Sequence, residues 1–184
     1  MRIIDGIASL FAQRGDSLYG GELISQREHA LQAATLAESE NATPLLIVAA
    51  LLHDIGHLIH DLPENSSDQG VDDKHEALGE AYLESSFGDQ VATPVRLHVA
   101  AKRYLCAVED DYLGRLSEAS RVSLRLQGGP FTEVEMKEFE SFRHWRDAVR
   151  LRRWDDLAKV EGMVTPSIEH FKGYMRNVLE TQKS

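Results

Sequence analysis

The residues most able to do chemistry are four histidines and two aspartates, which are spread over much of the 184-residue chain. Two of them, His53 and Asp54, are neighbours inside the apolar stretch 45–59. A buried carboxylate and imidazole need partners, and a bound cation would neutralise the first and use the lone pair of the second. The complete candidate set is His29, His53, Asp54, His75, His98 and Asp155.

The residue types indicate which metals such a site would hold. Imidazole and carboxylate ligands without a thiolate suit iron, manganese, zinc or cobalt. The single cysteine, Cys106, excludes an internal disulfide and a thiolate cage. Six candidates exceed the needs of one tetrahedral ion, so we expect two ions that share a carboxylate and leave positions open for substrate. A lone histidine would be better interpreted as a hydrogen-bonded core residue.

Helices must position these residues, because helical periodicity and capping residues recur and no alternating β-branched run indicates a strand. The expected N-caps are Thr43, Thr93, Ser117, Thr132 (with Glu135 in a capping box) and Thr165. The expected helices cover residues 3–14, 26–39, 44–59, 74–87, 93–104, 117–128, a segment after 132, 143–160 and 166–180. The predicted fold class is therefore all-α, a single helical domain over 1–184 with a lid loop near 16–25 and a longer loop over 61–73.

Composition limits the classes of partner. The net charge of −10 and the pI near 5.2 disfavour nucleic acid, because an acidic surface repels phosphate backbones. A small anion is still compatible with a local cluster of lysine and arginine. The apolar stretch 45–59 is too short to cross a membrane, and the N-terminus lacks the apolar run of a signal peptide. We expect a cytoplasmic protein, and the sequence predicts no oligomeric state.

The order of the six candidates, namely His, His-Asp, His, His and Asp, resembles the dinuclear metalloenzymes of the HD superfamily, which are helical bundles. The dipeptide alone is a weak signal, whereas the ordered set on helical segments is specific. The resemblance implies that Asp54 bridges two metal ions. It assigns the remaining ligands to one site of His29, His53 and Asp155 and to a second site of His75 and His98.

Most HD proteins are phosphohydrolases, but a smaller branch contains mixed-valent di-iron oxygenases. The loop with Tyr19, two glycines and Glu22, followed by Gln26, resembles the lid of the 2-amino-1-hydroxyethylphosphonate dioxygenase family. In that family a tyrosine occupies an iron position until substrate displaces it. The resemblance gives catalytic parts to Tyr19, also as a metal ligand, and to Glu22, and it places Gln26 at the substrate. Glycines supply the hinge that such a lid needs.

Two further features are similar to the same oxygenases. Lys102 follows His98 by one helical turn and can reach an anion on the same face. The stretches 117–121, 127–130 and 152–155 also match, and the resemblance assigns Ser120 and Arg152, together with His57, to the phosphonate. Arginine suits a tetrahedral anion because it has paired donors. Solvated surface cations are the common alternative for such residues.

The resemblance implies oxygen-dependent cleavage of a carbon–phosphorus bond, with two iron ions in the Fe(II)/Fe(III) state and O2 as co-substrate. The substrate would be a 1-hydroxy-2-aminoethylphosphonate or its trimethylammonio relative, and the products phosphate and glycine or glycine betaine. Glu22 is the candidate for the cationic end of that substrate. Three alternatives stay open: a phosphohydrolase acting on a nucleotide or small phosphate ester, a polyol oxygenase of the same branch, and an inactive HD scaffold.

Overall fold

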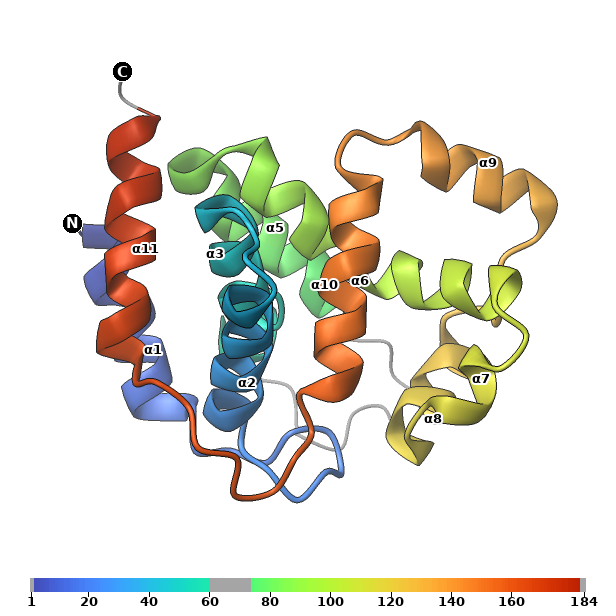
Figure 1. Cartoon of the computed structure of the whole chain (residues 1–184), viewed down its shortest axis with the longest axis horizontal. Helices are drawn as coiled ribbons and strands as arrows, with labels where there is room; N and C mark the ends of the chain where they lie inside the picture. The colour runs from blue at the N-terminus through green and yellow to red at the C-terminus, as the bar shows by residue number, and fades with distance from the viewer. Residues whose placement is uncertain (1, 60–73, 183–184) are drawn as a thin grey trace.

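The computed structural model describes residues 2–59 and 74–182. Within these residues the chain is helical, apart from loops and one isolated antiparallel bridge between Leu18 and Ser25, which confirms the all-α prediction. The helices are α1 (Arg2–Arg14), α2 (Gln26–Ser39), α3 (Pro44–Leu52), α4 (Ile55–Ile59), α5 (His75–Phe87), α6 (Asp89–Val108), α7 (Tyr112–Arg115), α8 (Glu118–Leu126), α9 (Glu133–Ser141), α10 (Trp145–Leu157) and α11 (Ile168–Thr181) (Figure 1).

Helices α2, α3, α6 and α10 form the centre of the molecule. Helix α3 packs against α2, α6 and α11, and α10 packs against α2 and α6. Helices α1 and α11 lie on one side of this centre, whereas α7, α8 and α9 lie on the other (Figure 1). Residues 46–52 of α3 are all buried, as its nearly uniform apolar composition predicts. None of the described helices is long and apolar enough to cross a membrane.

Capping residues set several helix starts as the sequence predicted. Thr43 accepts a hydrogen bond from the backbone N–H of Leu46, with Pro44 in the first turn of α3. Ser117 caps α8 in the same way, and Thr132 forms a capping box with Glu135 at the start of α9. These three predictions are confirmed, so local chemistry fixes where the helices on both sides of the centre begin.

Other expected boundaries are wrong. Residues 44–59 form two helices rather than one, because the chain turns at His53 and Asp54 between α3 and α4. Thr93 does not begin a helix: α6 starts after Gly88 and contains Pro94, which costs one backbone hydrogen bond. Helix α11 begins after Ser167, not after Thr165. The short α7 was not predicted, and the expected loop over 61–73 lies outside the described residues.

A glycine allows the turn after α3 to approach the next helix. A Cβ atom at Gly56 would lie 2.0 Å from the carbonyl oxygen of His75, so no larger residue fits this backbone contact. Helices α4 and α5 pack directly against each other at this point. The contact brings Asp54, two residues before the glycine, beside the first residue of α5.

Candidate metal centre and substrate site

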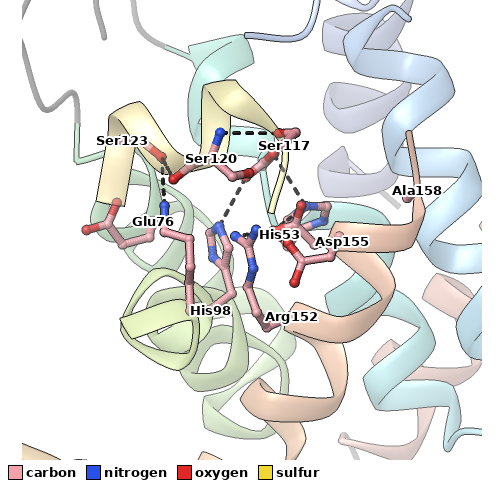
Figure 2. Close-up of polar contacts among 12 residues, drawn as sticks. His53, Glu76, His98, Ser117, Ser120, Ser123, Arg152, Asp155 and Ala158 are labelled. Carbon is pink, nitrogen blue, oxygen red and sulfur yellow. Dashed lines mark hydrogen bonds and ion pairs between the residues drawn. The ribbon is translucent and has the colours of Figure 1, made fainter. Parts of the chain in front are cut away.

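The predicted metal ligands lie in one buried cluster, although they come from five separate parts of the chain. They are supplied by α2, by the turn between α3 and α4, and by α5, α6 and α10. Each is at most 8% exposed. Figure 2 shows three of them, His53, His98 and Asp155, converging from different parts of the chain. The fold therefore brings together residues that are up to 126 positions apart, from 29 to 155.

Asp54 lies between two pairs of histidines. Its Oδ2 atom is 3.5 Å from Nε2 of His29 and 3.4 Å from Nε2 of His53. Its Oδ1 atom is 3.3 Å from Nε2 of His75 and 3.2 Å from Nε2 of His98. Each carboxylate oxygen thus faces one pair, which is the arrangement that a bridging carboxylate needs.

Backbone carbonyls orient three of these imidazoles. In each case the Nδ1 atom lies at hydrogen-bond distance from a carbonyl oxygen: His29 from Ala158 at 2.7 Å, His53 from Ala50 at 2.8 Å and His98 from Val95 at 2.6 Å. A carbonyl oxygen can only accept, so Nδ1 carries the hydrogen and donates it. The neutral ring then presents an Nε2 lone pair to the cluster, as metal-binding histidines do.

The facing Nε2 atoms fit a bound cation. Those of His29 and His53 are 3.0 Å apart, and those of His75 and His98 are 3.2 Å apart. The two lone pairs of His29 and His53, on atoms 3.0 Å apart, repel each other unless a positive centre lies beside them. Oδ1 of Asp54 is buried and accepts no hydrogen bond. Together these acceptor atoms form two groups, His29–His53–Asp54 and Asp54–His75–His98, each able to hold one metal ion.

Asp155 lies beside the first group. Its Oδ1 atom is 3.5 Å from Nε2 of His29, while its Oδ2 atom forms a 2.7 Å ion pair with Arg152. Burial raises the pKa of Asp155, but the charges of Arg152, His53, Lys159 and His29 together outweigh burial and lower it. The carboxylate is therefore ionised and turns one oxygen toward the histidines, as a further ligand would.

Loop 16–25, which the sequence predicts to be a lid, places Tyr19 against the same group. The phenol ring stacks on the His29 ring with centroids 3.7 Å apart, and its hydroxyl donates to Oδ1 of Asp155 at 3.4 Å. Burial, followed by the charges of Asp155 and Asp54, raises the pKa of Tyr19 well above its usual value in the absence of a cation. Glu22 follows in a tight turn, with its N–H donating to the Tyr19 carbonyl at 2.7 Å.

Two other predicted substrate residues lie near these groups or the lid. The His57 ring stacks on the His75 ring with centroids 4.0 Å apart, so it lies beside the second group. Gln26 is buried in the first turn of α2, and its backbone N–H donates to the carbonyl of Ser17 at 3.0 Å. This bond, like the capping box of Ser25, ties the end of the lid loop to α2.

Of the predicted anion-binding residues, Ser120 lies on α8, whereas Lys102 and Arg152 come from α6 and α10. Figure 2 shows Ser117, Ser120 and Ser123 in a row over His98 and Arg152. Lys102, one turn after His98 on α6, donates to Oγ of Ser123 at 2.7 Å. Burial, then the neighbouring Arg152, lowers the pKa of Lys102 to about 7. The structure thus brings Lys102, Ser120 and Arg152 to one side of the cluster.

Besides Asp155, two residues that the sequence did not single out hold Arg152. Its Nε donates to the hydroxyl of Tyr112 at 3.3 Å, and its guanidinium also pairs with Asp156. The Tyr112 hydroxyl donates to the same carboxylate of Asp156. Tyr112 comes from the unpredicted helix α7, so no sequence signal linked it to the site, whereas Asp156 could have been noticed from its i, i+4 spacing to Arg152.

Lys159, a third residue that the sequence did not single out, also contacts α8. Its Nζ atom donates to Oγ of Ser120 at 2.9 Å, and it lies 3.4 Å from Oγ of Ser117 and 3.7 Å from Oε1 of Glu22. It follows α10, which ends at Leu157, so helical spacing from Asp155 does not predict its position.

Comparison with known proteins identifies the family of this chain. The HD domain family matches residues 27–124, a range that contains five of the six candidate ligands, all except Asp155. The chain is 44% identical over 178 residues to the hydroxymethylphosphonate dioxygenase of Gimesia maris, covering 96% of this chain and 88% of that protein. It is 42% identical to the [1-hydroxy-2-(trimethylamino)ethyl]phosphonate dioxygenase (glycine-betaine-forming) of Leisingera caerulea, covering 97% and 91%. This chain belongs to the HD domain family.

Proposed function

We propose that this protein is a di-iron oxygenase that uses O2 to cleave the carbon–phosphorus bond of a 1-hydroxyalkylphosphonate. The observation that carries the proposal is the position of Asp54, with one oxygen toward each pair of histidines. Two further features suit an oxygenase with an anionic substrate. The phenol of Tyr19 lies against the first group, and basic and serine side chains meet at α8. Two relatives are named as dioxygenases of hydroxyphosphonates.

The reaction balances without any external reductant. For the simplest substrate, hydroxymethylphosphonic acid and O2 give formic acid and phosphoric acid. The carbon–phosphorus bond and one C–H bond break, the substrate supplies all four electrons, and both oxygen atoms end in the products. In the same way, 1-hydroxy-2-aminoethylphosphonate would give glycine, and its trimethylammonio relative would give glycine betaine. When bound, the iron pair would supply oxygen activation and the removal of hydrogen from C1.

The protein's own residues would bind and orient the substrate. The metal ligands would be His29, His53, Asp54, His75, His98 and Asp155, with Tyr19 giving way to substrate. We assign Lys102, Ser120, Arg152 and His57 to the phosphonate, because a buried cation and hydroxyl donors can hold an anion in a fixed orientation. Glu22 and Gln26 would contact the substrate from the side of loop 16–25.

Oxygen dependence separates this function from phosphate ester hydrolysis, which would use the same metal ligands. The iron-loaded protein should release phosphate from hydroxymethylphosphonate, from the 2-amino compound or from the trimethylammonio compound. Release should require O2 and consume one O2 per phosphate. An EPR signal of a coupled Fe(II)/Fe(III) pair should change when the substrate is added. Oxygen-independent phosphate release from a nucleotide, with manganese preferred to iron, would contradict the proposal.

A further inference from the structure

Two lysines reach the same face of α8 from different parts of the chain. Lys102 on α6 donates to Oγ of Ser123 at 2.7 Å, and Lys159 after α10 donates to Oγ of Ser120 at 2.9 Å. The two serines are three residues apart, so their side chains share one face of the helix. Both lysine side chains are largely buried, at 3% exposure of Lys102 and 11% of the Lys159 side chain.

Neither lysine donates its hydrogen bond on this face to a charged partner. Lys102 and Lys159 hydrogen-bond to serine hydroxyls, which offer an oxygen but no charge. Arg152, the third buried cation of this region, already lies between the carboxylates of Asp155 and Asp156. The same carboxylates also attract the lysines, since Asp155 and Asp156 act on Lys102 and Asp155 acts on Lys159. Three basic side chains thus share two carboxylates, so this face of α8 is suited to an anionic ligand.

Glu22 balances Lys159 only in part. Its Oε1 atom is 3.7 Å from Nζ of Lys159, beyond hydrogen-bond distance, and this buried oxygen accepts no hydrogen bond. Nζ of Lys159 also lies 5.6 Å from the centre of the Tyr19 ring. Under the proposed function Tyr19 gives way to substrate, so the space that it occupies borders Lys159.

We propose that Lys159 binds the phosphonate group of the substrate, together with Lys102, across the row formed by Ser117, Ser120 and Ser123. The inference rests on the proposed function, because the displacement of Tyr19 opens the space beside Lys159. Lys159 then exchanges its loose ion pair with Glu22 for charge-assisted hydrogen bonds to the phosphonate. Such bonds are shorter and stronger than those to a neutral hydroxyl.

The test measures binding rather than turnover. Methylphosphonate lacks the C1 hydroxyl, so its Kd can be measured by calorimetry on the iron-loaded protein under nitrogen. Lys159→Met should weaken this binding about tenfold or more, and Lys159→Arg should restore part of the loss. Lys172→Met is the matched control, since Lys172 is a partly buried lysine of α11 that pairs with Glu169. Its Kd should equal that of the unchanged protein.

Glu22→Gln separates binding from a role in holding the lid. If Lys159 binds the anion, removal of its partial counter-charge should tighten methylphosphonate binding, whereas a role only through Glu22 would make this variant as weak as Lys159→Met. Iron content and Tm identify any variant that has lost its fold, and Lys159→Gln, which keeps a donor for Ser120, then replaces Lys159→Met. An unchanged Kd in the folded variant overturns the inference. Lysine-dependent binding without oxygen-dependent phosphate release would instead contradict the proposed function alone.

Discussion

Replacing Gly56 by alanine should remove one metal ion and keep the other. The added Cβ would lie 2.0 Å from the carbonyl oxygen of His75, and Cβ atoms essentially never approach closer than 3.0 Å. The start of α5 must therefore move away from α4 by about 1 Å or more, whereas metal–ligand distances tolerate only about 0.2 Å. The shift acts on His75 in the second group, but His29 and His53 of the first group lie on other elements.

The assay is anaerobic loading with Fe(II), followed by removal of free metal and measurement of iron per chain. We expect about two ions in the unchanged protein and about one in Gly56→Ala, with overpacking also lowering stability by about 1–3 kcal/mol. Gly79→Ala is the matched control, because its Cβ would meet the end of a side chain, Cγ1 of Val95, at 3.0 Å. It should keep both ions. If Gly56→Ala also binds two ions, the link between this backbone contact and the second group is wrong.

Three other changes test separate parts of the site. Asp54→Asn should reduce bound iron to less than one ion per chain, because the carboxylate between the two groups loses its charge; normal iron content would contradict a bridging role. Lys102→Met should keep its iron but raise KM. In the unchanged protein, the affinity for methylphosphonate should fall as pH rises through about 7, because Lys102 loses its proton there. The affinity of the variant should lack this step. Tyr112→Phe should raise KM a few-fold by loosening Arg152, whereas Tyr104→Phe, which removes a similar hydroxyl–carboxylate bond to Glu140 at an exposed site, should not.

Local chemistry predicted the helices whose starts depend on a single side chain. Thr43, Ser117 and Thr132 each accept a hydrogen bond from a backbone N–H in the first turn, and this signal is present in the sequence itself. The same reasoning was wrong for Thr93, because Gly88, with φ of 70°, starts α6 earlier and the helix tolerates Pro94 in its interior. A threonine–proline pair permits a helix start but does not require one.

The metal cluster was more predictable than the substrate side. Imidazoles and carboxylates in an apolar setting are rare enough that their order along the chain indicates a shared site. Lys159 and Tyr112 carry no such signal, because lysine and tyrosine are ordinary surface residues and both lie at or beyond the ends of helices. Their roles depend on how α7 and the segment after α10 pack against α8, which only the folded chain reveals.

The turn between α3 and α4 connects the fold to the chemistry. Helix α3 is so apolar that a continuous helix over 44–59 would bury His53 and Asp54 against hydrophobic neighbours, at a high cost in desolvation. Ending the helix at Leu52 lets Asp54 face imidazoles from α2, α5 and α6. The imidazoles of His29 and His98, whose Nδ1 atoms donate to backbone carbonyls, offer lone pairs rather than charge, so the ionised carboxylate still needs a cation. Bound metal should therefore stabilise the fold, by about 4 kcal/mol when free metal is a thousand times its Kd.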